Sequence, residues 1–177
     1  MIIEVDGGQI ETRKGDIAAQ QDMEAVVNAA NAELLPGGGV AGALHSGAGP
    51  ALADACAPFA PIAPGEAVLT EAFDLPNNYV IHCLGPVYGQ DKPEAELLAS
   101  CYEKALQIAD DHSISNVAFP SLSTGAFGYP LEEAVGTAVP EVLETLSNCP
   151  NVNQVCFVLF SEKDLKVYED YLTRIAG

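Results

Sequence analysis

Residues 155–160 read VCFVLF, six apolar residues without any alternation of apolar and polar positions. An unbroken apolar run of this length indicates a central strand that is buried on both of its faces. Ser161 follows, and then the spaced residues Leu165, Tyr168 and Leu172, which predict a capped amphipathic helix. A strand buried on both faces and followed at once by a helix indicates a parallel sheet with helices packed on it.

The remainder of the chain repeats this alternation of short strands and helices. Further strands are expected at 2–5, 9–12, 25–28, 67–70, 79–83 and 117–119, and further helices at 42–56, 93–111 and 131–146. Strands that alternate with helices predict an α/β fold, here a three-layer α/β/α sandwich with a mixed, largely parallel sheet. No repeat or linker-like segment interrupts the pattern, so residues 1–177 are expected to form a single domain.

Charge and composition argue against several classes of partner. The chain has 25 acidic and 7 basic residues, a formal net charge of −18. Binding to nucleic acid or to an anionic membrane requires clustered Lys and Arg, so neither partner is expected. No apolar stretch reaches the roughly 18 residues that a spanning helix needs. The acid excess also suggests a salt-adapted, halophilic source as a hypothesis.

The cysteines indicate a reducing compartment. Five are present, an odd number, and none shows CxxC spacing. This pattern favours free, mostly buried thiols, and no signal peptide is recognisable at the start of the chain. We therefore expect a cytoplasmic protein. Neither His45 nor His82 has a Cys or Asp partner at metal-ligand spacing, and His112 is expected to be exposed near a helix end. No metal site is therefore expected, and His45 and His82 are interpreted as structural.

Four loops follow the carboxyl ends of expected strands, where parallel sheets bind their ligands. They lie at 15–17, 28–31, 123–128 and 160–161, and the second leads into GGGVAGALH at 37–45. The glycine-rich turns at 37–39 and 123–128 are each expected to enter a helix, whose first N–H groups are unpaired. Neither turn contains Lys or Arg, which predicts phosphate binding by backbone amides. Alternatively, the two turns are an ordinary flexible loop and a tight turn.

Six motifs occur in the order and spacing of macrodomains. They are GDI at 15–17, VVNAAN at 26–31, GGGVAGALH at 37–45, GEAVLT at 65–70, YVIHCLGP at 79–86 and FPSLSTGAFGYP at 119–130. The chain resembles this family over essentially its whole length, and most closely the branch that includes MacroD-type hydrolases and viral macrodomains. The resemblance implies ADP-ribose as ligand, either free or attached to a protein or metabolite. It implies no cofactor, and we expect a monomer.

The resemblance also implies which residues bind the adenine. Asp16 would accept a hydrogen bond from the adenine amino group, Ile17 would line the same pocket, and Phe160 would pack on the ring. From the residues alone, Asp16 could instead cap a helix, and Phe160 could be a core residue at the end of its strand. The two roles of Asp16 are compatible with each other.

The other half of the ligand would lie between the two glycine-rich turns. The resemblance implies that Asn31 hydrogen-bonds the distal ribose, whereas an Asx turn that stabilises the loop is the alternative. One side of the diphosphate would contact Gly38, Gly39 and Val40. The other side would contact Ser123, Thr124, Gly125, Ala126 and Phe127. The Phe127 ring would lie against the distal ribose, or else belong to the core, and Asn28 is expected to be structural.

Ala41 leaves the chemistry open. Hydrolases of the MacroD type carry an aspartate at this position, usually assigned to activating the attacking water, and general-base help contributes roughly 10²–10⁴ in rate. One reading is a hydrolase of ADP-ribose esters, acting on mono-ADP-ribosyl-Asp/Glu or O-acetyl-ADP-ribose, in which Asn31 and a ligand phosphate orient the water. The other readings are a binding module without turnover and a different nucleotide-phosphate site on the same fold.

Overall fold

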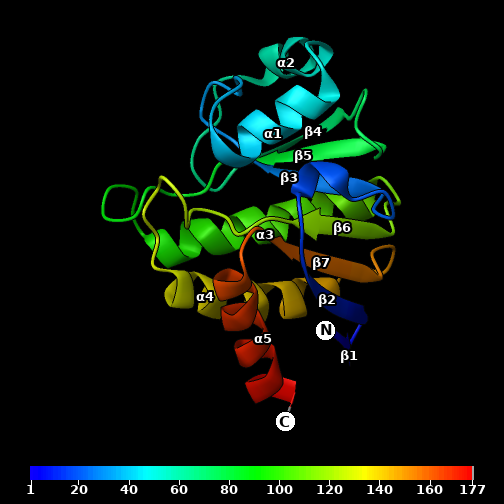
Figure 1. The fold of residues 1–177 in the computed structure, drawn as a ribbon, viewed down its shortest axis with the longest axis vertical. Coiled ribbons are helices and arrows are strands. Elements are labelled where there is room, and N and C mark those ends of the chain that lie inside the picture. The colour runs from blue at the N-terminus through cyan, green and yellow to red at the C-terminus, as the bar shows by residue number, and fades with distance from the viewer. Residues whose placement is uncertain (177) are drawn as a thin grey trace.

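The computed structural model describes residues 1–176, which form a seven-stranded sheet in the order β1-β2-β7-β6-β3-β5-β4 (Figure 1). The strands are β1 Ile2–Val5, β2 Gly8–Lys14, β3 Ala25–Ala29, β4 Ala67–Glu71, β5 Tyr79–Cys83, β6 Asn116–Phe119 and β7 Gln154–Leu159. The five inner strands are parallel, and β1 and β4 pair antiparallel at the two edges. The predicted mixed, largely parallel sheet is confirmed.

Helices cover both faces of this sheet. They are α1 Gly39–Ala48, α2 Ala51–Cys56, α3 Glu94–Asp111, α4 Leu131–Leu146 and α5 Glu162–Ala176, with short 3₁₀ turns η1 Ile17–Ala19 and η2 Ala57–Phe59. Apolar residues of α3, α4 and α5 share one core with one face of the sheet. Those of η1, α1 and α2 share a second core with the opposite face. The predicted three-layer sandwich is therefore confirmed.

Strand β7 shows why its sequence is apolar throughout. Val155, Phe157 and Leu159 belong to the core under α3–α5, whereas Cys156 and Val158 belong to the core under α1 and α2. The strand ends one residue earlier than expected, because its last ladder partner is Lys14 opposite Leu159. Phe160 lies beyond this pair and is 86% exposed, so its interpretation as a core residue is wrong.

The expected helix at 42–56 is in fact two helices, and the first begins earlier. Gly39 already belongs to α1, which ends at Ala48. Gly49 then adopts φ +86°, a conformation that favours glycine, and donates its N–H to the carbonyl of His45. Pro50, which has no N–H to continue the helix, immediately precedes α2. His45 thus lies in the second turn of α1.

The cap of the last helix and the state of the cysteines agree with the sequence-based expectations. The Ser161 hydroxyl accepts a hydrogen bond from the Asp164 N–H at 3.1 Å, which confirms the cap of α5. All five cysteines are free and buried, as expected. Within residues 1–176, no helix combines the length and apolar character needed to cross a membrane.

Candidate functional site

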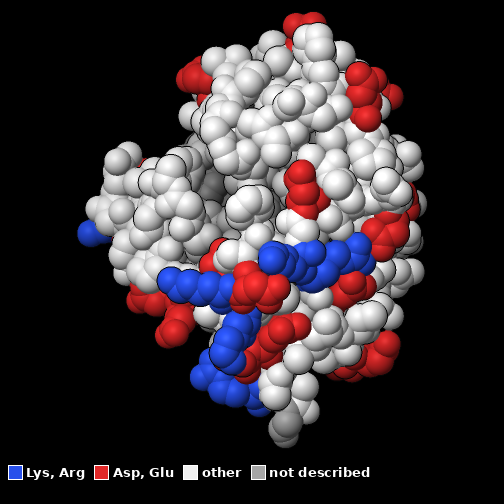
Figure 2. All heavy atoms as spheres, viewed as in Figure 1, with Lys and Arg blue, Asp and Glu red and all other residues white. Residues whose placement is uncertain are grey.

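The parallel strands bring the four candidate loops to one edge of the sheet. The carboxyl ends of β2, β7, β6, β3 and β5 follow one another along this edge. Asp16 follows β2 and Phe160 follows its neighbour β7, whereas the 123–128 turn follows β6 and Asn31 follows β3. Figure 2 shows a hollow on the side of the molecule that is turned towards the viewer. In the same view of Figure 1, the amino end of α1 and the loop between β6 and α4 lie beside it.

The proposed adenine end is built on the short turn η1. Asp16 is the N-cap of this turn, and its Oδ1 accepts a hydrogen bond from the Ala18 N–H at 2.9 Å. Its capping role is thus confirmed, and the carboxylate remains exposed at the surface. Ile17 is buried against the α1-side core. Gly15 donates to the carbonyl of Leu159 at 3.0 Å, which keeps Asp16 and Phe160 on adjacent strand ends.

The glycine run forms the entrance to α1. Gly39 has φ +58°, a left-handed conformation that a larger residue adopts only with strain. No heavy atom lies within 4 Å of the position that a Cβ would occupy on Gly38 or Gly39. These backbone segments therefore face open space at the positive end of a ten-residue helix, the arrangement that suits an anion.

Asn31 stabilises the loop that leads into the glycine run. Its Nδ2 donates to the carbonyl of Leu35 at 2.8 Å, and its Oδ1 accepts from the Leu35 N–H at 3.0 Å. Asn31 thus stabilises its own loop, as the alternative interpretation of this residue expected. Each amide atom has a second bonding position, one N–H on nitrogen and one lone pair on oxygen, that these two bonds leave unused.

The second glycine-rich turn is compact and does not enter a helix directly. The Gly128 N–H bonds to the carbonyl of Gly125, and the Tyr129 N–H bonds to the carbonyl of Ser123, at 3.0 and 2.9 Å. Helix α4 begins only at Leu131, so the expected helix N-terminus at this turn is wrong. Exposed atoms of the turn belong mainly to Gly125, Ala126 and Gly128.

The side chains of this second turn are held by the protein itself. Thr124 donates from its hydroxyl to Ser121 Oγ at 2.8 Å. Phe127 is half-buried and packs against the α1-side core, so core packing contributes to its position. Sequence reasoning did not single out Tyr88, whose N–H donates to the carbonyl of Phe127 at 2.9 Å. In the sequence, Gly85, Pro86 and Gly89 mark this loop, but none of them points to Tyr88.

A buried polar group of four side chains lies on the face of the sheet that α1 and α2 cover. His82 is fully buried, its Nδ1 is 3.0 Å from Asn28 Nδ2, and its Nε2 is 2.9 Å from Thr70 Oγ1. Cys56 Sγ lies 3.5 Å from Nε2. Burial, and to a lesser extent the nearby His45, lowers the pKa of His82 to about 4. The ring is thus neutral at pH 7, and both His82 and Asn28 have the structural role that was expected.

His45 differs from His82 in its surroundings. It is buried on α1, and neither ring nitrogen has a hydrogen-bond partner among residues 1–176. Burial lowers the pKa of this imidazole as well. Over the same residues, no cluster of three or more His, Cys, Asp or Glu side chains is placed to hold a metal ion.

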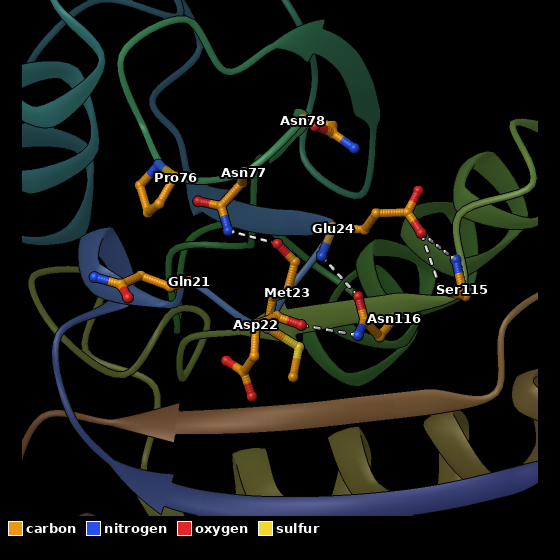
Figure 3. Close-up of a pocket in the computed structure, with 9 residues that line it drawn as sticks. All are labelled: Gln21, Asp22, Met23, Glu24, Pro76, Asn77, Asn78, Ser115 and Asn116. Atoms are coloured by element: carbon orange, nitrogen blue, oxygen red, sulfur yellow. Dashed lines mark hydrogen bonds between the residues drawn. The ribbon is translucent and has the colours of Figure 1, made fainter.

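A polar cavity of about 370 Å³ occupies the opposite end of the sheet, at the amino ends of β3, β5 and β6 (Figure 3). Its polar groups mostly bond one another. Ser115 donates from Oγ to Glu24 Oε1 at 2.9 Å, Asn116 Oδ1 accepts the Glu24 N–H, and Asn77 donates to the carbonyl of Met23. Sequence reasoning did not find this cavity, because its residues are scattered loop amides and acids. We interpret it as a junction that ties three strands together.

Two glycine-rich turns at the carboxyl edge of a parallel sheet define an α/β protein whose candidate site is built from backbone amides. The Macro domain family model matches residues 27–138, and the chain belongs to the macrodomain family. An O-acetyl-ADP-ribose deacetylase of Enterobacter cloacae subsp. cloacae is 42% identical over 171 residues, covering 94% of each chain.

Two solved structures resemble the fold closely. The Oceanobacillus iheyensis macrodomain with ADP has a TM-score of 0.94 and 37% identity, covering 99% of this chain and 96% of that one. The Trypanosoma brucei macrodomain in complex with ADP-ribose has a TM-score of 0.86 and 37% identity, covering 92% of this chain and 68% of that one.

Proposed function

We propose that this macrodomain binds ADP-ribose and hydrolyses ADP-ribose esters, either O-acetyl-ADP-ribose or mono-ADP-ribosyl-Asp/Glu. The observation that carries the proposal is the pair of exposed turns at 37–39 and 123–128 on the neighbouring strands β3 and β6, with no Lys or Arg in either. Backbone N–H groups there suit a diphosphate. The names of the similar proteins, a deacetylase and complexes with ADP and ADP-ribose, support the same ligand.

The ligand lies along the carboxyl edge of the sheet, with its adenine at the β2 and β7 end and its distal ribose at the β6 and β3 end. The adenine contacts Asp16, Ile17 and Phe160 at the ends of β2 and β7. The diphosphate contacts Gly38, Gly39 and Val40 on one side and Ser123, Thr124, Gly125 and Ala126 on the other. The distal ribose lies between Asn31 and Phe127. No cofactor enters this scheme, and the free, buried thiols fit the cytoplasm as its compartment.

Asn31 is the side chain that we assign to the reaction. Water attacks the ester carbonyl, the bond between that carbon and the ribose oxygen breaks, and the ribose oxygen takes up a proton while the acid product loses one. Asn31 can orient the water or the ribose with the N–H and lone pair that its bonds to Leu35 leave unused. Ala41, buried in the first turn of α1, offers no group that could accept the proton.

A binding module without turnover is the second candidate, and the alanine at position 41 is the observation that favours it. Such a module would retain both phosphate turns and capture ADP-ribose on proteins or metabolites. It would release no product from the ester.

Calorimetry with ADP-ribose and product release from O-acetyl-ADP-ribose test the two candidates together. We expect saturable binding and product formation above the uncatalysed rate. Asn31→Ala should lower turnover more than it lowers affinity, because its proposed contact is with the reacting end of the ligand. Asn78→Ala, an exposed asparagine at the opposite end of the sheet, is the matched control and should change neither quantity.

Each contrary outcome has a separate meaning. Binding with no product above the background rate would refute the hydrolase and leave the binding module as the remaining candidate function. Absence of binding to ADP-ribose would refute both candidates.

A further inference from the structure

The segment 85–91, which follows β5, packs against the second glycine-rich turn. The Tyr88 N–H donates to the carbonyl of Phe127 at 2.9 Å. The ring of Tyr88 meets that of Tyr129 edge to face, with the ring centroids 4.9 Å apart and an interplanar angle of 62°. Tyr88 thus contacts the turn through its backbone at Phe127, and through its side chain it contacts Tyr129, the residue that directly follows the turn.

The two segments also approach closely at Gly85. A Cβ at this position would collide with Ser123 Oγ. Ser123 itself has φ +66° and is buried, and its hydroxyl has no hydrogen-bond partner among residues 1–176. The beginning of the turn is therefore held against Gly85, the first residue of segment 85–91, by steric fit rather than by a hydrogen bond of its side chain.

Segment 85–91 is itself fixed by hydrogen bonds at three points. Asp91 Oδ2 accepts the Val87 N–H at 2.8 Å, and Glu94 Oε2 accepts the Gly89 N–H at 3.1 Å. The Tyr88 hydroxyl donates to Glu133 Oε2 at 3.2 Å, which joins the segment to α4. A segment anchored to α3 and α4 in this way can act as a support for its neighbour.

We propose that Tyr88 is a positioning residue that holds the 123–128 turn in the conformation that receives the diphosphate and distal ribose. This inference rests on the proposed function. Tyr88 acts on Phe127 and Tyr129 at the β6 end of the site, whereas Asp16 and Phe160 follow the ends of β2 and β7. Its loss therefore affects the phosphate and distal-ribose half of the ligand and spares the adenine half.

The test measures the affinities of ADP-ribose, ADP and AMP for the wild type and for the variants Tyr88→Ala and Tyr88→Phe. Tyr88→Ala removes the ring contact with Tyr129, so affinity for ADP-ribose and ADP should fall about fivefold, the central effect of losing one aromatic pair. Affinity for AMP should change by less than about twofold, since AMP lacks the second phosphate and the distal ribose. Tyr88→Phe keeps the ring and should retain the affinity of the wild type for all three.

Phe73→Ala is the matched control, because Phe73 is an aromatic residue that is 40% exposed, as Tyr88 is, and it follows β4 at the opposite end of β5. It should leave the three affinities unchanged. Equal losses for AMP, ADP and ADP-ribose in Tyr88→Ala, or no loss in a folded variant, would overturn the proposal. Tyr88→Leu replaces the alanine variant if thermal unfolding shows that the latter does not fold. If the wild type binds none of the nucleotides, it is the proposed function that fails.

Discussion

His82 illustrates how single buried residues govern the behaviour of this protein at low pH. Its ring is packed among Asn28, Thr70 and Cys56, and its pKa lies near 4 instead of the ordinary 6.5 because burial disfavours the charged form. The unfolded chain therefore binds a proton to this residue at a higher pH than the folded protein does.

The sign of the pH effect follows from this difference. Stability contributed by neutral His82 is fully present above pH 6.5 and is lost as the pH falls towards 4, a change of about 3 kcal/mol at most. We expect His82→Gln to be less stable at neutral pH but to lose less unfolding free energy over this interval. Urea unfolding at several pH values measures it. Exposed His112→Gln is the control, and parallel pH profiles for wild type and His82→Gln would contradict the assignment.

At the scale of elements, the junction between the glycine run and α1 depends on Gly42. A Cβ on Gly42 would collide with the backbone carbonyl of Gly37, which cannot rotate away as a side chain can. The first turn of α1 and the 37–39 segment are thus packed backbone to backbone. This close approach fixes the position of the amides that we assign to the diphosphate.

Gly42→Ala should therefore weaken ADP-ribose binding at least about tenfold, because the glycine run must shift. Gly136→Ala is the matched control: it lies inside α4, where the nearest atom to a new Cβ is 4.0 Å away. That variant should keep its affinity and gain about 0.5–1 kcal/mol of stability from helix propensity. Calorimetry and urea unfolding of both variants decide the matter, and equal affinities would show that the Gly42 contact is dispensable.

Local patterns predicted most elements because each strand or helix buries a face that its own sequence records. The apolar run of β7 and the apolar stripe of α5 are examples, since each hydrophobic pattern can be recognised without knowing which elements pack against it. The break at Gly49 was missed because alanines and leucines continue on both sides of it. The support by Tyr88 depends on a contact between two loops, which no periodicity encodes. The bonds of Asn31 to Leu35 are local to one loop, and the sequence had offered this role as an alternative. For the binding site, motifs indicated the edge of the sheet, and residue roles came from the family resemblance.

At the scale of the whole molecule, most of the few cations lie in one region. Five of the seven basic residues belong to β2 and α5, and Figure 2 shows them as a band across this face. Several of them are paired with carboxylates, for example Lys14 with Glu162 at 3.3 Å and Lys166 with Asp170 at 3.2 Å. Outside this band the only basic residues of the sequence are Lys92 and Lys104, so acidic residues dominate the rest of the surface and the folded state repels itself.

Salt should therefore stabilise the protein. Raising NaCl from about 0.1 M to about 1 M shortens the screening length from about 10 Å to about 3 Å and should increase the unfolding free energy. Urea unfolding at the two concentrations tests this. A triple variant in which exposed Asp6, Glu96 and Glu144 become lysine should show a smaller gain, which separates screening from general salt effects. An unchanged or lower stability in salt would refute both self-repulsion and the halophilic hypothesis.

The five buried cysteines are native reporters of local opening in this fold. Burial raises the pKa of Cys56 to about 11 and that of Cys156 to about 12, so these two thiols are almost entirely protonated in the closed protein at neutral pH. An alkylating reagent then reacts only when the surrounding element opens. The thiols lie in α2, β5, α3, β7 and the turn after α4, and so sample both helical layers and the sheet. The order in which they are labelled would reveal which layer of the sandwich detaches first, without any introduced probe.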